Sequence, residues 1–334
     1  MHSFSETILC WYDTYGRDLP WRRTRDPYAI WLSEIILQQT RIAQGQAYWE
    51  RFMAAWPDVE ALAAASEDEV LRLWQGLGYY SRARNLHAAA QQIVAAGGFP
   101  DTLAGIRALK GVGDYTAAAI GSIAFGLPAA VVDGNVYRVL ARHYGIETPV
   151  GSTAAKKEFT ALAQSLLPAD RPGDFNQGMM DFGALQCTPA APPCAICPLA
   201  ASCAALATGR VDSLPVREKG AAVQTRRFDY VYVRFRGRTA IRRRGPGDIW
   251  TGLYEPLVKE EAGCKNTPIC TPKPVLLRAG VKHQLTHRTL LVDFYLWEPT
   301  EEPALPEGYI WIDEAELDRY AKPRLFELLL EALP

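Results

Sequence analysis

Four cysteines stand within 17 residues of this chain, at Cys187, Cys194, Cys197 and Cys203. Their spacing is C-x6-C-x2-C-x5-C, and the four prolines between them favour a loop over a helix or a strand. Thiolate sulfur is the ligand that zinc and iron–sulfur clusters prefer. A zinc ribbon usually has two close CxxC pairs, whereas only Cys194 and Cys197 are that close here. The spacing therefore predicts a loop whose four thiolates bind one inorganic centre.

The bulk composition predicts an ordinary soluble protein. With 334 residues the chain is long enough for two domains. Its net charge of −1 gives no general attraction to nucleic acid, so any such binding must come from local patches. Of the 36 cationic residues 27 are arginine, which suits phosphate recognition.

Nothing in the sequence predicts export or a membrane span. The first 20 residues include Glu6, Asp13, Arg17 and Asp18, which do not fit a signal peptide. No run of 18 apolar residues is present. The total of seven cysteines is odd and argues against a disulfide framework. We therefore expect a cytoplasmic protein.

Helical periodicity dominates residues 1–209. Ser66 followed by Glu69 forms a capping-box pattern at the start of one helix. Apolar residues recur at helical spacing in six segments: 29–43, 67–74, 81–96, 114–125, 135–144 and 153–167. The first part of the chain is therefore predicted to be all-α.

The pattern changes after residue 209. Residues 210–227 contain charges and few large apolar side chains, which is typical of a linker. Alternation with a period of two follows at 228–232, 290–296 and 310–312, and 313–331 has a helical pattern. We expect a smaller domain of mixed α and β structure at 228–334.

A G-V-G turn joins two of the predicted helices. Gly111, Val112 and Gly113 precede the helix at 114–125. Glycines allow a tight turn, and the amide groups at the start of the next helix can bind a phosphate without a basic side chain. A plain helix–helix turn has the same pattern, so the motif alone does not decide between the two.

Several long motifs in order resemble the adenine DNA glycosylases of the MutY type, within the endonuclease III superfamily. The resemblance covers nearly the whole chain. Its segments are WLSEIILQQT at 31–40, GLGYYSRARNL at 76–86, LKGVGDYT at 109–116, VDGN at 132–135 and the cysteine loop at 187–203.

The resemblance implies a multidomain α and α+β fold. Residues 1–209 would form an all-α helix-hairpin-helix glycosylase domain, with a six-helix part at about 22–132 and a cluster part at about 1–21 plus 133–209. After the linker at 210–227, residues 228–334 would form a Nudix-like α/β lesion-recognition domain. The four cysteines would hold a 4Fe-4S cluster.

Glu34 is the candidate general acid. On a helix its neighbours at i−4, i−3, i+3 and i+4 are Ile30, Trp31, Leu37 and Gln38, with no lysine or arginine within one turn. A glutamate without local cations in apolar surroundings has a raised pKa and can donate a proton near neutrality. A surface glutamate is the alternative, and the resemblance favours the acid that protonates the departing adenine.

Asp133 is the candidate second carboxylate. An Asp-Gly-Asn sequence also suits a helix N-cap, and the two roles are compatible. Cleavage of an N-glycosidic bond develops positive charge on the sugar, which an ionised carboxylate stabilises. The resemblance assigns that role to Asp133, with Asn135 as its hydrogen-bonding neighbour.

Tyr115 distinguishes two reactions. In the bifunctional members of the superfamily a lysine at this position attacks the sugar and then cleaves the strand. A tyrosine is a poor Schiff-base former. The sequence therefore predicts base removal without strand cleavage.

The resemblance also implies residues that contact DNA or the lesion. A base must leave the duplex before an enzyme acts on it, and protein side chains fill the gap. Aromatic residues in these segments are equally compatible with the core. The implied contacts lie at Gln38, Gln39, Thr40, Leu77, Gly78 and Tyr79, and at Gly111, Val112 and Gly113 of the turn.

The second domain carries a further likeness and a departure. Residues 247–255 resemble the L-W-x-G-L-Y-E motif of the family's C-terminal domain, but no glutamate-rich Nudix metal helix follows. Pyrophosphatase activity is therefore not expected. The family's loop for reading 8-oxoguanine is typically Phe-Ser-His, and this chain has Leu285, Thr286 and His287.

The leading hypothesis is a monomeric, monofunctional glycosylase. It would remove adenine opposite 8-oxoguanine or guanine in double-stranded DNA and meet the nucleoid only through DNA. A bifunctional glycosylase/lyase is disfavoured by Tyr115. A non-catalytic iron–sulfur DNA-binding protein is disfavoured because binding alone needs neither Glu34 nor Asp133.

Overall fold

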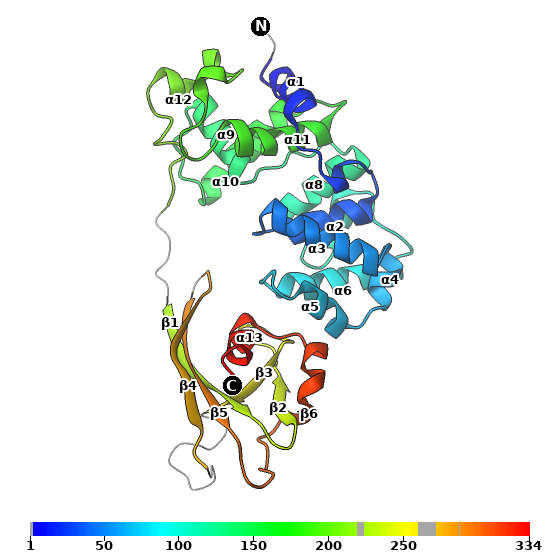
Figure 1. Ribbon diagram of the computed structural model, residues 1–334. Helices are drawn as coiled ribbons and strands as arrows, with labels where there is room; N and C mark the ends of the chain where they lie inside the picture. Colours follow the sequence, from blue (N-terminus) through cyan, green and yellow to red (C-terminus); the bar gives the residue numbers. More distant parts are fainter. Residues whose placement is uncertain (1–2, 219–223, 260–271, 287) are drawn as a thin grey trace. The chain divides into compact units, whose positions relative to one another are not determined.

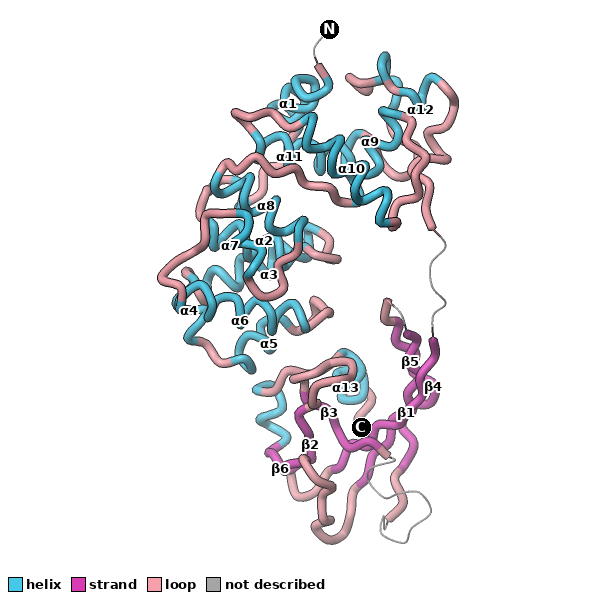
Figure 2. The backbone as a smooth tube through the Cα atoms, turned by 180° about the vertical axis from the view of Figure 1, so that it is seen from behind, coloured by secondary structure: helices cyan, strands magenta, loops and turns pink. Residues whose placement is uncertain are grey.

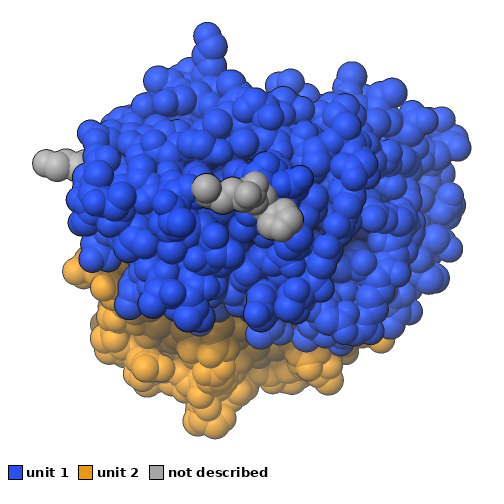
Figure 3. All heavy atoms as spheres, turned by 90° about the horizontal axis from the view of Figure 1, so that it is seen from above, with its two compact units in different colours: residues 1–63, 88–219 blue, residues 64–87, 220–334 orange. Residues whose placement is uncertain are grey.

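The computed structural model describes residues 3–218, 224–259, 272–286 and 288–334. The chain forms two compact units, which Figure 3 colours separately. The first unit comprises residues 1–63 and 88–219, and the second comprises 64–87 and 220–334. The division falls inside the helix α6 (Ser81–Ala95). The domain limits at 209 and 228 stay a prediction.

The first unit is built from helices, as predicted (Figure 1). They are α1 (Phe4–Tyr15), α2 (Pro27–Leu37), α3 (Ile42–Ala55), α4 (Val59–Ala64), the end of α6, α7 (Leu103–Ala108), α8 (Asp114–Phe125), α9 (Gly134–Tyr144), α10 (Thr153–Leu166), α11 (Pro172–Asp181) and α12 (Ala204–Ala207). Short 3-10 turns lie at Pro20–Arg22, Cys194–Ile196 and Ala200–Ser202, and a π-helical turn at Phe182–Gln186. Within the described residues, no helix has the length and apolar character needed to span a membrane.

One predicted helix was wrong in extent. The apolar pattern over 29–43 suggested a single helix, but α2 ends at Leu37 and α3 starts at Ile42. Gln39 lies between them with a φ of +59°, a left-handed conformation that an α-helix does not contain. The break leaves residues 38–41 as a loop beside the end of α2.

Two apolar clusters position the first unit's site. Ile8, Phe159, Phe175 and Phe182 are almost fully buried where α1, α10 and α11 pack around α9. A second cluster joins α2 to α8 and the segment before α9; it contains Ile30, Ala118, Ala119, Ile123, Ala129 and Val131. This packing brings the middle of α2, the start of α8 and the start of α9 together.

The second unit contains a mixed six-stranded sheet, visible in Figure 2. The strands are β1 (Gln224–Val233), β2 (Arg238–Arg243), β3 (Tyr254–Val258), β4 (Val275–Gln284), β5 (Arg288–Trp297) and β6 (Tyr309–Asp313). Their order is β4-β5-β1-β3-β2-β6, and β1 and β5 are parallel, with Tyr230 opposite Phe294. The predicted mixed α/β class of this part is confirmed.

From Phe228 to Val233 the strand β1 buries side chains on both of its faces. Tyr230 and Tyr232 join one apolar cluster, and Val231 and Val233 join another. The helix α13 (Arg324–Leu330) contributes Phe326 to the first cluster. The helix predicted for 313–331 is divided into a 3-10 turn at Glu314–Arg319 and α13, because Pro323 interrupts a continuous helix.

Residues 64–87 join the sheet through polar contacts inside the second unit. They include α5 (Glu67–Trp74), whose predicted capping box of Ser66 and Glu69 is confirmed. Arg243 Nη2 lies 2.8 Å from Glu67 Oε1, and the Lys322 amide donates to Gln75 Oε1 at 3.0 Å. The loop that follows α5 therefore belongs to the same compact unit as the sheet.

Candidate active site

A cavity of about 660 Å³ opens in the first unit between α2, α8, α11 and the segment before α9. Seven of the residues singled out in the sequence line it, although they come from three distant segments. These are Glu34, Gln38, Gln39, Thr40, Tyr115, Asp133 and Asn135. The structure thus brings the predicted acid, carboxylate and tyrosine to one site.

Glu34 faces this cavity from a helix that is mostly buried. Asp26 caps α2 by accepting from the amides of Tyr28 and Ala29, and eight of its residues, among them Ile30 and Trp31, are buried. Glu34 is half-buried and lines the cavity. Burial raises the pKa of Glu34 to about 7, with Arg22 and a hydrogen bond from Tyr115 opposing the rise. Near neutral pH the carboxyl group is therefore partly protonated.

Tyr115 stands in the first turn of α8. Its hydroxyl also lies 3.4 Å from the sulfur of Met180. Burial and the nearby carboxyl groups raise the pKa of Tyr115 well above its ordinary value. Its side chain is therefore a neutral phenol that can donate a hydrogen bond to Glu34.

Asp133 is the N-cap of α9. Its Oδ1 accepts from the amides of Asn135 and Val136, both at 2.8 Å, and its Oδ2 accepts from Asn135 Nδ2 at 2.8 Å. Burial raises its pKa, and these hydrogen bonds together with Arg138 oppose that rise. Asn135 is fixed in turn, because its Oδ1 accepts from Arg138 Nη2 at 2.8 Å. The capping hydrogen bonds thus fix the orientation of the Asp133 carboxylate and offset part of the rise in pKa that burial causes.

The loop after α2 forms another wall. Gln38 Nε2 donates to Thr116 Oγ1 at 3.2 Å, which ties the loop to α8. Thr40 Oγ1 lies 3.4 Å from the Gln38 carbonyl oxygen, and Gln39 is exposed. These residues therefore stand at the rim of the cavity.

The G-V-G turn positions Tyr115 rather than lining the cavity. Gly111 has a φ of +78°, a conformation that glycine adopts readily, and Gly113 is the N-cap of α8. Among the side chains that the structure describes, none caps this helix start. Val112 is 8% exposed, so it anchors the turn in the interior. The first amides of α8 are available to an anionic group in the way that helix N-termini allow.

Sequence reasoning missed the arginines of the cavity. Arg17 and Arg22 line it, and both contact the buried Asp181 at the end of α11. Asp181 stands 159 residues after Arg22, so no local pattern connects them. Gln177 and Met180 of α11 were missed for the same reason.

The four cysteines line one small cavity of about 30 Å³. Arg142, which is 3% exposed, organises this loop by donating to Cys187 Sγ at 3.4 Å and to the Thr188 carbonyl at 2.7 Å. Burial raises the pKa of Cys197 to about 11, so its thiolate needs a cationic partner. Within the described residues, no three His, Cys, Asp or Glu side chains gather tightly enough for a single metal ion.

A second cavity, of about 830 Å³, lies entirely in the second unit. Tyr79 and Thr286 both line it, and their hydroxyl groups form a hydrogen bond with each other. Tyr79 has a φ of +47° and is 47% exposed, whereas Leu77 is 7% exposed and packs inside. Gly78 is held through its carbonyl, which accepts from Trp74 Nε1 at 3.0 Å.

The described part of the predicted reading loop, Leu285 and Thr286, lines this cavity. Leu285 is partly buried against the sheet's apolar cluster, and Thr286 is exposed. His287 lies outside the described residues. The segment 76–81 and the segment 284–286, far apart in the sequence, thus share one cavity.

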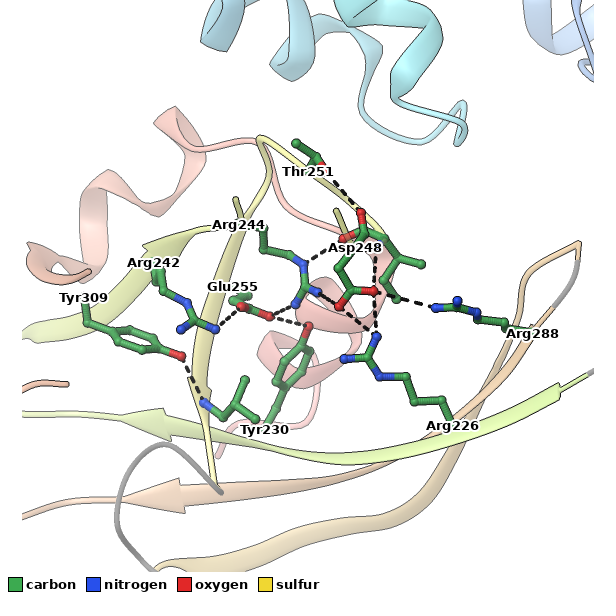
Figure 4. A network of polar contacts seen from close by, with 11 residues as sticks. Arg226, Tyr230, Arg242, Arg244, Asp248, Thr251, Glu255, Arg288 and Tyr309 are labelled. Atoms are coloured by element: carbon green, nitrogen blue, oxygen red, sulfur yellow. Dashed lines mark hydrogen bonds and ion pairs between the residues drawn. The ribbon is translucent and has the colours of Figure 1, made fainter. Parts of the chain in front are cut away.

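Figure 4 shows a polar network at the motif 247–255. Asp248 accepts from Arg226 and from Arg244, each at 2.7 Å. Glu255 is fully buried and accepts from Arg242 at 2.7 Å, from Tyr230 at 3.4 Å and from Arg244. Asp248 and Glu255 of this motif thus form ion pairs with arginines of the same unit and have a structural role there.

Known protein families match the helical part and the sheet-containing part of the chain separately. Residues 32–168 match the family described as HhH-GPD superfamily base excision DNA repair protein, and residues 230–332 match the NUDIX domain. Adenine DNA glycosylase from Buchnera aphidicola subsp. Baizongia pistaciae is 32% identical over 87% of this chain and 84% of that protein.

The chain belongs to the adenine DNA glycosylase family.

Other members of the adenine DNA glycosylase family match with higher identity over shorter lengths. The human protein is 46% identical over 61% of this chain and 39% of its own length. The mouse protein is 44% identical over 64% of this chain and 44% of its own length. The match therefore spans about two fifths of the length of these mammalian relatives.

Solved structures support the helical fold of this family member. A thermostable thymine-DNA glycosylase superposes with a TM-score of 0.56 and 33% identity, over 61% of this chain and 95% of that chain. Endonuclease III in a non-covalent DNA complex gives a TM-score of 0.52 at 22% identity, over 61% of this chain and 94% of that chain. The second likeness concerns the fold alone.

Proposed function

We propose that the chain is a monofunctional adenine DNA glycosylase that removes adenine opposite 8-oxoguanine or guanine in double-stranded DNA. One observation carries the proposal. Glu34, with a pKa of about 7, shares a single cavity with Tyr115 and Asp133. An acid of that pKa can hold a proton at neutral pH and release it during the reaction.

Each of these groups has a distinct part in the reaction. A flipped adenine enters the cavity, and Glu34 donates its proton to a ring nitrogen of the base. The N-glycosidic bond then breaks, its electron pair leaves with the adenine, and positive charge develops on the sugar. The Asp133 carboxylate stabilises that charge. Water adds to the sugar carbon and transfers a proton to the Glu34 carboxylate, which restores the acid and leaves an abasic site.

Monofunctional chemistry follows from the residues at the cavity. Strand cleavage through a Schiff base needs an amine near the sugar. Among the described residues that line the cavity, the basic ones are arginines, which stay protonated, and Tyr115 is a phenol. A bifunctional lyase is therefore the weaker hypothesis.

The first test is a strand assay on a duplex with adenine opposite 8-oxoguanine. The protein should leave an intact strand that breaks at the adenine site only after alkali. Tyr115→Lys should add strand cleavage and an adduct trapped by borohydride, whereas the matched control Tyr115→Phe should add neither. Efficient trapping by the unsubstituted protein would contradict the monofunctional proposal.

For recognition of the opposite base, we infer that the second unit reads 8-oxoguanine. The support is the cavity shared by Tyr79 and Thr286, which combines an exposed ring with a hydroxyl group. Oxidised guanine differs from guanine at its Hoogsteen edge, where a hydroxyl or an imidazole can form hydrogen bonds. We propose that Thr286 and His287 supply these bonds and that Leu285 adds apolar contact.

Thr286→Ala should slow adenine removal opposite 8-oxoguanine by up to about tenfold, the value of one hydrogen bond. Removal opposite guanine should change little, so the two single-turnover rates should converge. Thr289→Ala is the matched control, because that hydroxyl bonds Gln284 at 2.9 Å on the same hairpin. Equal slowing on both duplexes would mean that this loop does not read the lesion.

The cysteine loop is proposed to hold a 4Fe-4S cluster through Cys187, Cys194, Cys197 and Cys203. Their convergence on one cavity supports it. The cluster would supply a cross-link among the four sulfur atoms. Cys187 and Cys197 pack against the core cluster of α1, α9, α10 and α11, so that cross-link would brace the first unit.

Two other classes of function explain less of the site. A non-catalytic iron–sulfur DNA-binding protein leaves Glu34 and Asp133 without a role. A nucleotide hydrolase would need free acidic groups for metal in the second unit, yet Glu255 is engaged by Arg242, Arg244 and Tyr230. The strand assay separates these classes, since neither alternative releases adenine.

A further inference from the structure

The loop between α5 and α6 has an unusual backbone. Gly76, Gly78 and Tyr79 have φ values of +97°, +71° and +47°. Glycine adopts a left-handed conformation readily, whereas a tyrosine in it is strained. A strained residue keeps such a conformation only where its surroundings enforce it, and strained residues gather at functional sites. Neighbouring groups must therefore hold Tyr79 in place.

The main group around this loop is Arg82, in the first turn of α6. Its guanidinium carbon lies over two rings, 5.0 Å from the centre of Trp74 and 5.5 Å from the centre of Tyr79. Its Nη2 lies 3.3 Å from the carbonyl oxygens of Leu77 and Gly78, to which it donates. Arg82 is 8% exposed, and attraction between a cation and a ring is stronger away from water.

Further hydrogen bonds close the loop around this side chain. Trp74 Nε1 donates to the Gly78 carbonyl at 3.0 Å, which fixes the first of the two rings. The Leu77 amide donates to the Trp74 carbonyl at 3.1 Å, and the Gly76 amide donates to the Tyr80 hydroxyl at 3.3 Å. A planar guanidinium can stack through its face while it donates from its edge, which the ammonium group of lysine cannot do.

The Tyr79 side chain is thus held from two sides. Arg82 lies over its ring, and its hydroxyl bonds the hydroxyl of Thr286 at the wall of the 830 Å³ cavity. Tyr79 is still 47% exposed. An exposed ring in a fixed orientation is suited to stack on a nucleobase.

We propose that Arg82 is a positioning residue that sets the Tyr79 ring for contact with the base opposite the target adenine. Its role is indirect, because it is buried and acts through Tyr79. The inference rests on the proposed function of the second unit as the reader of 8-oxoguanine, but order in the loop can be measured without DNA.

The first test is hydrogen exchange of the Gly76 and Leu77 amides, followed by NMR in the free protein. Arg82→Met should speed this exchange about tenfold, because the loop opens more often without the guanidinium. Arg82→Lys keeps the charge but not the planar stack, and it should speed exchange as well. Amides of β1, in the core of the same unit, should exchange as before. Arg72→Met is the matched control, because Arg72 is exposed on α5.

Unchanged exchange in the loop, or the same increase in the loop and in β1, would overturn the inference. If Arg82→Met does not fold, Arg82→Lys decides alone, and normal loop exchange in that variant contradicts the proposal.

The second test is equilibrium binding to duplexes with 8-oxoguanine or guanine opposite 2′-fluoro-2′-deoxyadenosine. The fluorine disfavours positive charge on the sugar and so prevents excision. Tyr79→Ala should weaken binding to the 8-oxoguanine duplex about tenfold, the value of one stacked base. Arg82→Met should lower the preference for 8-oxoguanine over guanine toward that of Tyr79→Ala. Adding Arg82→Met to Tyr79→Ala should then have no further effect.

Two outcomes of the binding test would contradict the role of Arg82. One is normal binding by Tyr79→Ala, and the other is a further loss of the full factor when both substitutions are combined. Failure of the proposed function is a separate result. If the unsubstituted protein releases no adenine, that function fails, while hydrogen exchange still tests whether Arg82 orders the loop.

Discussion

Glu34→Gln should still bind a mispaired duplex but excise adenine about 10²–10⁴-fold more slowly, the typical contribution of a positioned general acid. The amide has nearly the same shape and can still accept a hydrogen bond from Tyr115. It has no transferable proton. Single-turnover rates on a duplex with adenine opposite 8-oxoguanine measure the loss, and gel-shift affinities measure the retained binding.

A matched control separates chemistry from charge. Glu158→Gln makes the same change at an exposed position on α10 and should leave the rate unaltered. Because Glu34 is buried in partly protonated form, Glu34→Gln should not lower the melting temperature appreciably. A near-normal excision rate in Glu34→Gln would mean that another group donates the proton.

Cys197→Ser should deplete iron and acid-labile sulfide and destabilise the first unit. Cys197 packs beside Leu199 against the core cluster of α1, α9, α10 and α11, so loosening the loop exposes apolar surface. A loss of about 3 kcal/mol would lower the melting temperature by about 10 °C. Iron and sulfide analysis of anaerobically purified protein, with thermal melting, measures both effects.

The exposed thiol of Cys10 on α1 provides the matched control. Cys10→Ser should keep the metal content and the melting temperature. One zinc ion per chain and no acid-labile sulfide in the unsubstituted protein would contradict the cluster. Because the loop is braced by Arg142 and lies apart from the Glu34 cavity, residual Cys197→Ser protein that folds should show weakened DNA binding more than altered chemistry.

Local sequence signals predicted the elements that carry the site. The Asp-Gly-Asn pattern at Asp133 does cap a helix, and the glycine turn does lead into α8. These features depend on neighbouring residues, so one segment suffices to predict them. The family resemblance assigned Glu34, Tyr115 and Asp133 to one reaction, and the structure places all three on one cavity.

Strand segments that are exposed on both faces could not be predicted from the sequence. Residues of β4 are mostly exposed, so its sequence shows no period of two. The first four residues of β1 are exposed as well, and they fell in the range expected to be a linker. The alternation became visible only from Phe228, where burial begins.

Pairings between distant segments were the other gap. The contact of Asp181 with Arg22 and the hydrogen bond between Tyr79 and Thr286 each join residues far apart in the chain. The sequence around each of these residues does not predict which distant residue it contacts. Such pairings follow from the packing of whole elements, here α11 beside α1 and the loop after α5 beside the hairpin of β4 and β5.

The pH dependence of adenine excision tests the central role of Glu34 most directly. A general acid works only when protonated, and the pKa of Glu34 is about 7. Single-turnover rates of the unsubstituted protein should therefore be nearly constant below that pH and fall about tenfold per pH unit well above it. Glu34→Gln should show a low rate without this fall. A rate that stays constant from about pH 6 to 9 in the unsubstituted protein, or the same fall in Glu34→Gln, would contradict Glu34 as the acid.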